Sequence, residues 1–183
     1  MSPSELEKTA YHESGHAVMA FLKKVRILQV SVIPDDSVGI LGVLVKSNKI
    51  EIESNQTKQK EVFLNRLENF ILVAMAGMVA EFILTGIRNY KGAVQDITYI
   101  QDLLARITYS QKEKELYEDM LWARTSFILR EEGNWKMVKT LATHLLNKSP
   151  TLTGKQTLEI LRKANWNIDK QNIQNISDSL NRK

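Results

Sequence analysis

The pentapeptide HESGH at residues 12–16 constrains this chain more than any other stretch of the sequence. Positions i and i+4 of an α-helix lie one above the other on the same face, so His12 and His16 can point at a common object from consecutive turns. Two imidazoles in this relation can occupy two corners of a tetrahedral zinc site. Apolar residues flank the pentapeptide at helical spacing. The sequence therefore predicts an amphipathic helix that carries a zinc site.

The glutamate between the two histidines predicts how the metal would be used. Glu13 adjoins the first histidine, and a carboxylate there reaches the water at the zinc ion rather than the ion itself. It can take the proton of that water and pass it to the leaving amine. The alternative is a pair of histidines on an ordinary surface helix. That alternative is disfavoured because the pattern is rare by chance and lies on an amphipathic helix.

A tetrahedral catalytic zinc site needs a third protein ligand and an open position for water. The chain has no cysteine, so the third ligand must be a histidine or a carboxylate. The one remaining histidine, His144, fits a helix surface or core better than a metal site. Glu81 lies in an apolar stretch, where a carboxylate is costly unless it is paired or bound to metal. Asp96 follows a glycine-containing loop, where it could equally be an N-cap. Spacing alone leaves Glu81 and Asp96 open as the third ligand.

The hydrophobic pattern predicts a mainly α-helical fold with a small β element. Two strand-like segments, 25–34 and 39–47, are expected to form a hairpin or to lie side by side in a small sheet. A capping box that begins at Ser4 opens the first helix, and Gly86 ends the second. Helices are expected at about 5–24, 56–86, 96–110, 112–130, 133–148 and 153–164, the last opened by Thr153.

Charge and hydropathy exclude several function classes. The net charge of +4 is modest and its basic residues are spread out, whereas nucleic-acid binding normally shows a concentrated basic face. The amino-terminal residues lack the pattern of a signal peptide. The most apolar stretch, 70–87, contains Glu81 and several small residues. It is expected to be a buried helix of a soluble core and not a transmembrane span. The expected localisation is cytoplasmic, or at a membrane through a partner.

Four short segments resemble, in the correct order, the peptidase domain of FtsH-type ATP-dependent metalloproteases. The resemblance continues into the closing helices and covers about residues 5–165. It implies a zinc peptidase domain at 1–165, followed by a polar tail or short helix at 166–183. The segments are TAYHESGHAVMAFL, similar to the zinc-site helix; VSVIPDDSVGILG, similar to the strand and turn; AGMVAEFILTG, similar to the Ala-Gly-x-x-Ala-Glu helix; and GAVQDI, similar to the Gly-Ala-x-x-Asp segment.

The resemblance implies a helical, zincin-like site and a role for each of its residues. Its zinc ligands fall on His12, His16 and Asp96, and its general base falls on Glu13. Glu81 matches a family glutamate near the site, which suits the orientation of a ligand imidazole through its far N–H. The implied function is a zinc-dependent endopeptidase that hydrolyses unfolded proteins or peptides.

The sequence also departs from the family that it resembles. Members of the family carry an ATPase module, usually span a membrane and form hexameric rings, but this sequence contains no G-x-x-x-x-G-K-[ST] motif. The expected partners are therefore an unfolded polypeptide substrate and either further copies of the chain or a separate ATPase. Ser14 replaces a common alanine and Met78 a frequent arginine, which concerns specificity or oligomer contacts. The alternative function is a non-catalytic interaction or regulatory module, against which the intact Glu13 argues.

Overall fold

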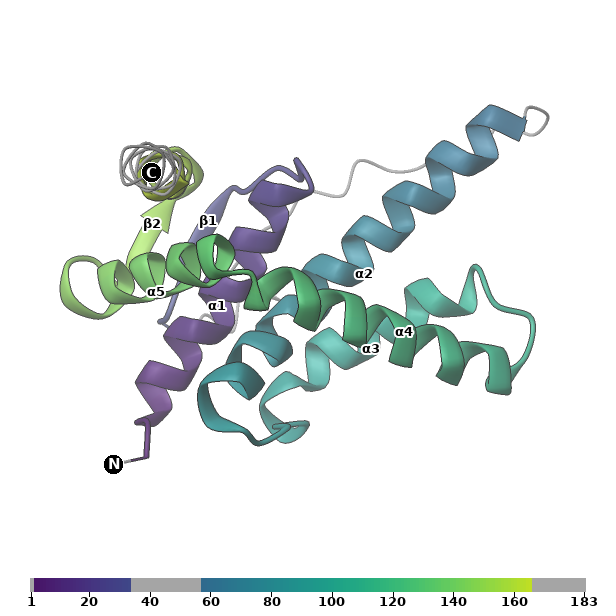
Figure 1. The fold of residues 1–183 in the computed structure, drawn as a ribbon, viewed down its shortest axis with the longest axis horizontal. Helices are drawn as coiled ribbons and strands as arrows, with labels where there is room; N and C mark the ends of the chain where they lie inside the picture. Colours follow the sequence, from purple (N-terminus) through teal and green to yellow (C-terminus); the bar gives the residue numbers. More distant parts are fainter. Residues whose placement is uncertain (1, 34–56, 166–183) are drawn as a thin grey trace, which may run out of the picture.

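The computed structural model describes residues 2–33 and 57–165 (Figure 1). This part of the chain is mainly helical with one two-stranded sheet, which confirms the predicted fold class. The predicted strand at 39–47 and the predicted tail at 166–183 lie outside the described residues. The elements are α1 (Glu5–Leu22), β1 (Gln29–Ser31), α2 (Thr57–Thr85), the 3-10 helix η1 (Lys91–Ala93), α3 (Val94–Ala105), α4 (Gln111–Arg130), α5 (Glu132–Asn147), β2 (Thr151–Thr153) and a closing helix at 154–165.

Helix α1 begins and ends with recognisable caps. Ser4 Oγ accepts a hydrogen bond from the backbone N–H of Glu7 at 3.2 Å, as the capping signal predicts. At the other end the N–H of Val25 reaches back to the carbonyl oxygen of Ala20, and Lys24 adopts a left-handed φ of 56°. This Schellman-like turn stops the helix slightly before the predicted end.

Helix α2 forms the centre of the fold. Its carboxyl-terminal half is almost wholly buried, and Gly86, at a φ of 75°, ends it with a hydrogen bond from its N–H to the carbonyl oxygen of Phe82. The stretch Glu61–Thr85 is long and apolar enough to cross a membrane, but 67% of its most apolar window is buried inside the protein. Such burial is usual for a central core helix. In Figure 1 the amino-terminal half of α2 extends beyond the other helices.

Helices α1 and α2 pack most extensively against each other, and glycine allows their close approach. A Cβ on Gly15 would overlap the carbonyl oxygen of Ala76 and would lie 2.7 Å from the Cβ of Ala80. Only a residue without a side chain fits this crossing. Helix α5 packs on α1, while α3 and α4 pack on α2. The crossing therefore sets one face of α1 directly against α2.

The two strands join segments that are far apart in the sequence. Strand β1 pairs with β2 in antiparallel register, with Val30 opposite Leu152. The pairing with β2 was not predicted, because the expected partner was the segment at 39–47. After β2, Thr153 and Gln156 form a capping box, in which the backbone N–H of each residue donates to the other's side chain at 2.8 and 3.3 Å. This box starts the closing helix, as predicted.

Candidate metal centre

The two histidines of α1 lie on the same face of the helix and are directed toward α2. Their ring centroids are 4.7 Å apart and the rings meet edge to face. His16 is completely buried, and the side chain of His12 is 12% exposed. The i, i+4 relation that the sequence predicts is therefore present, in a site largely closed to solvent.

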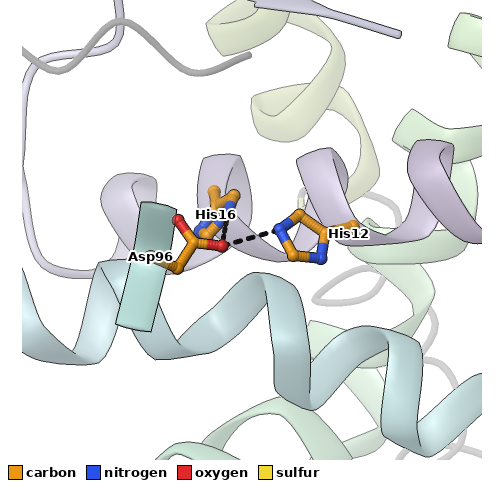
Figure 2. Close-up of side chains that lie close together, drawn as sticks. All are labelled: His12, His16 and Asp96. Atoms are coloured by element: carbon orange, nitrogen blue, oxygen red, sulfur yellow. Dashed lines mark hydrogen bonds and ion pairs between the residues drawn. The ribbon is translucent and has the colours of Figure 1, made fainter. Parts of the chain in front are cut away.

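The first turn of α3 brings a carboxylate to both imidazoles. Asp96 Oδ2 lies 2.9 Å from His12 Nε2 and 3.4 Å from His16 Nε2 (Figure 2). The three side chains are buried and offer ligand atoms within 4.8 Å of one another. Ala93 occupies the N-cap position of α3, so the alternative reading of Asp96 as an N-cap is wrong. Asp96 points instead into the space between α1 and α3.

The backbone of α2 sets the orientation of His16. The Nδ1–H of His16 donates to the carbonyl oxygen of Val73 at 2.7 Å. In a neutral imidazole this leaves the lone pair on Nε2, directed toward Asp96. His16 Nε2 has no hydrogen-bond partner among the described residues, and neither has Asp96 Oδ1. The metal centre therefore contains two buried atoms, one nitrogen and one oxygen, that can donate an electron pair to a metal and that lack a hydrogen-bond partner among the described residues.

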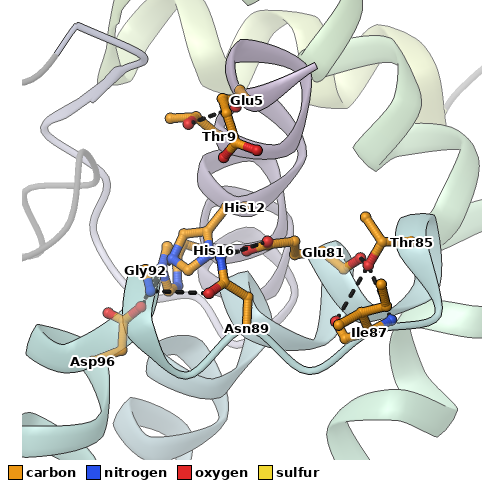
Figure 3. Close-up of polar contacts among 10 residues, drawn as sticks. All are labelled: Glu5, Thr9, His12, His16, Glu81, Thr85, Ile87, Asn89, Gly92 and Asp96. Atoms are coloured by element: carbon orange, nitrogen blue, oxygen red, sulfur yellow. Dashed lines mark hydrogen bonds and ion pairs between the residues drawn. The ribbon is translucent and has the colours of Figure 1, made fainter. Parts of the chain in front are cut away.

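A second carboxylate faces the other nitrogen of His12. Glu81 Oε2 lies 3.6 Å from His12 Nδ1, longer than an ordinary hydrogen bond but within the range of an ion pair. Glu81 Oε1 accepts a hydrogen bond from Asn89 Nδ2 at 2.9 Å (Figure 3). The two carboxylates that the sequence left open therefore occupy different places, Asp96 at Nε2 and Glu81 at Nδ1.

The site is electrostatically suited to a cation. Burial alone would lower the pKa of His12, but the hydrogen bond to Asp96 and the Glu81 carboxylate outweigh it and raise that pKa to about 10. Burial alone would raise the pKa of Asp96, but the charge of the nearby His16 and the hydrogen bond and charge of His12 hold it well below its usual range. The interaction with His12 also lowers the pKa of Glu81. In the metal-free site, a proton on His12 supplies the positive charge that the surrounding carboxylates favour.

Glu13 is the third acidic side chain of the site. It is 9% exposed, and its Oε2 has no hydrogen-bond partner among the described residues. Burial raises the pKa of Glu13, and the nearby His16 and His12 offset part of that increase. A carboxylate whose pKa is raised toward neutrality is a better proton acceptor than one at the surface. The adjacent Ser14 is also buried, with its Oγ unpaired among the described residues.

Gly77 of α2, which was not predicted as a site residue, lies opposite the two imidazoles. A Cβ on Gly77 would overlap His16 Nε2 and would lie 2.6 Å from His12 Nε2. The absence of a side chain therefore lets both imidazole nitrogens lie against the backbone of α2. Glycine inside an apolar helix is unfavourable for the helix itself, and that cost was a signal in the sequence that a close approach occurs there.

The donor set and its spacing fit zinc. Zinc–ligand distances of about 2.0–2.2 Å place the ligand atoms of a tetrahedral site about 3.3–3.5 Å apart. The observed separations of Asp96 Oδ2 from the two imidazole nitrogens, 2.9 and 3.4 Å, lie near that range.

The third histidine of the chain, His144, lies away from this site. It belongs to α5, where its Nδ1 donates to the carbonyl oxygen of Thr140 in its own helix.

The chain is also similar in sequence to known proteins. The family model of peptidase family M41 matches residues 1–110, a stretch that contains every site residue described above. The ATP-dependent zinc metalloprotease FtsH of Lancefieldella parvula is 24% identical, in an alignment that covers 90% of this chain and 30% of that protein. The chain thus spans less than a third of the length of this relative.

Proposed function

The chain belongs to peptidase family M41, and from this premise we propose that it is a zinc-dependent endopeptidase domain that hydrolyses unfolded proteins or peptides. The similarity to a protein named as a zinc metalloprotease supports this proposal. The observation that carries it is the buried cluster of His12, His16 and Asp96 beside the buried carboxyl group of Glu13.

In this proposal three side chains hold the metal. His12 and His16 bind through Nε2 and Asp96 through its carboxylate, which matches the donors that zinc prefers. When bound, zinc supplies a Lewis acid that activates water and polarises a carbonyl oxygen. Glu81, whose Oε2 faces Nδ1 of His12 at 3.6 Å, would hold the ring through that ion pair and so keep Nε2 directed toward the metal.

Glu13 moves the proton in this mechanism. It accepts a proton from the attacking water and then donates it to the nitrogen of the leaving amine. Its raised pKa suits both steps, because a carboxyl group that titrates nearer to neutral pH can act first as a base and then as an acid. Burial also excludes bulk water from competing for the same proton.

The proposed substrate follows from the burial of the metal centre, and the proposed partners follow from the absence of a nucleotide-binding motif in this sequence. A scissile peptide bond reaches a buried centre only when its backbone is extended, so the substrate is an unfolded protein or a peptide. The 183 residues hold no G-x-x-x-x-G-K-[ST] motif, so a separate ATPase would supply any ATP-driven unfolding, and further copies of the chain are the other partner we propose. A cytoplasmic location, or one at a membrane through such a partner, suits this role.

A non-catalytic module with the same fold is the alternative. Glu13 argues against it, since a buried carboxyl group with an oxygen that has no hydrogen-bond partner among the described residues costs stability and serves no packing purpose. Such a cost is typical of a residue retained for chemistry.

The proposal is tested with one substrate protein in two states, a stable folded form and a destabilised variant. Opening a folded protein locally costs free energy up to its full stability of about 5–15 kcal/mol. We expect cleavage of the destabilised form only, abolished by a chelator, restored by zinc and indifferent to ATP. Failure to cleave the unfolded substrate with zinc present would contradict the proposal, and equal cleavage of both states would contradict the inferred substrate class.

A further inference from the structure

Asn89 contacts two different parts of the metal centre's surroundings. It lies in the loop between α2 and η1, half-buried. Its Nδ2 donates to Glu81 Oε1 at 2.9 Å, and its Oδ1 accepts the backbone N–H of Gly92 at 3.1 Å (Figure 3). One amide therefore links the helix that carries Glu81 to the turn that leads into α3.

The first contact determines how Glu81 presents its carboxylate. With Oε1 held by Asn89, Oε2 is the oxygen that faces His12 Nδ1. Glu81 is 6% exposed, so water cannot easily replace a lost hydrogen-bond donor. Without Asn89 the carboxylate would be free to rotate, and its hold on the His12 ring would weaken.

The second contact determines where α3 begins. Gly92 belongs to η1, which runs directly into α3, and Asp96 lies in the first turn of that helix. A Cβ on Gly92 would lie 2.7 Å from Asn89 Nδ2, so the close contact needs a glycine. The hydrogen bond to Gly92 thus places the segment that brings Asp96 to the histidines.

We propose that Asn89 is a positioning residue of the metal centre, which orients His12 through Glu81 and places Asp96 through Gly92. This inference rests on the proposed zinc site. It concerns how the site is preorganised, since Asn89 itself contacts neither a ligand nitrogen nor Asp96 in the described structure.

The loop has other anchors, so a loss of Asn89 is separable from a loss of the loop. The Arg88 guanidinium lies 4.3 Å from the ring centroid of Trp122 on α4. Thr85 Oγ1 donates to the carbonyl oxygen of Glu81 at 2.8 Å and accepts the N–H of Ile87 at 3.1 Å. Thr85 therefore holds the same loop without touching the Glu81 carboxylate.

These contacts supply a matched pair of variants, Asn89→Ala and Thr85→Val. Zinc affinity is measured by competition with a chromogenic chelator, and the unfolding temperature of each metal-free protein is measured beside it. Direct partners of ligands typically change metal affinity by about 10–100-fold, and for Asn89→Ala, one step further away, we expect a loss of roughly three- to tenfold. Thr85→Val should leave the affinity within about twofold of wild type, because the carboxylate keeps its donor. Asn89→Ser, whose hydroxyl is too short to bridge both partners, serves if Asn89→Ala does not fold.

A double-mutant cycle with Glu81→Ala tests whether Asn89 acts through the glutamate. The Asn89→Ala loss should be clearly smaller in the Glu81→Ala background, and the absorption bands of the Co²⁺-loaded protein should shift in Asn89→Ala but not in Thr85→Val. Full additivity in the cycle would overturn the action of Asn89 through Glu81, and equal losses for Asn89→Ala and Thr85→Val would overturn the inference as a whole. Absence of zinc binding by the wild-type protein would instead overturn the proposed function.

Discussion

His16 donates its Nδ1–H to the carbonyl oxygen of Val73 at 2.7 Å, across the crossing of α1 and α2. A backbone carbonyl on the central core helix can move very little, so it fixes both the ring plane and the tautomer of the imidazole. The other nitrogen is left as a buried lone pair without a hydrogen-bond partner among the described residues. The packing of the core thus prepares one ligand of the proposed metal centre before any metal arrives.

The first prediction concerns which carboxylate binds the metal. His12→Ala and His16→Ala should each abolish tight zinc binding, because two ligands do not replace three. Asp96→Ala should weaken binding more strongly than Glu81→Ala, for which the roughly 10–100-fold loss of an outer partner is expected. Metal content after dialysis against a weak chelator measures all four variants. Loss of zinc in Glu81→Ala but not in Asp96→Ala would reverse the assignment.

The second prediction concerns the space left by Gly77. A Cβ there meets the two imidazole nitrogens and not a backbone, so Gly77→Ala should lower zinc affinity strongly. The metal-free fold should lose less stability than in Gly15→Ala, since an imidazole can shift where a backbone cannot, and alanine favours a helix over glycine by about 1 kcal/mol. Zinc titration and thermal unfolding of the metal-free protein measure the two effects separately.

Gly15→Ala is the matched control for Gly77→Ala. Its Cβ would overlap the carbonyl oxygen of Ala76, so the damage should fall on the packing of α1 against α2 and lower the unfolding temperature. If Gly77→Ala bound zinc as tightly as the wild type, the two imidazole nitrogens beside Gly77 would not be the metal's ligands.

The third prediction concerns the pH dependence of stability without metal. The pKa of His12 is about 10 in the folded protein against an ordinary 6.5, so the folded state binds that proton more tightly. Its contribution to stability is complete below about pH 6.5 and is lost as pH rises toward about 10. The metal-free wild type should therefore lose stability over this range more steeply than His12→Gln, in urea unfolding at a series of pH values. Equal slopes for the two proteins would show that Asp96 and Glu81 do not hold the proton on His12.

Local sequence patterns predicted the helices and several of their ends. Three helix ends were predicted correctly, at Ser4, Gly86 and Thr153. At each of them the side chain or the backbone conformation of one residue caps the helix, so the neighbouring sequence is enough to identify it. The pairing of β1 with β2 was not predicted, because it joins segments separated by about 120 residues and leaves no local signal.

The metal centre was predictable only in part, for a similar reason. Helical spacing placed His12 and His16 on one face, but whether Asp96 or Glu81 approaches Nε2 depends on how α3 and α2 pack against α1. The hydrogen bond from His16 ends on the backbone carbonyl oxygen of Val73. Every residue type at position 73 would supply the same atom. Side-chain identity therefore carries no information about that contact.

The central claim is that Glu13 moves the proton at a zinc centre held by other residues, and Glu13→Gln tests it most directly. Glutamine keeps the size of the side chain but cannot accept the proton, and in this account Glu13 is not a ligand. The variant and the wild type are loaded to equal zinc content and compared on one unfolded substrate. We predict unchanged zinc affinity and cleavage lower by roughly 10²–10⁴-fold, the usual size of general-base catalysis. Cleavage at the wild-type rate by the zinc-loaded variant would contradict it.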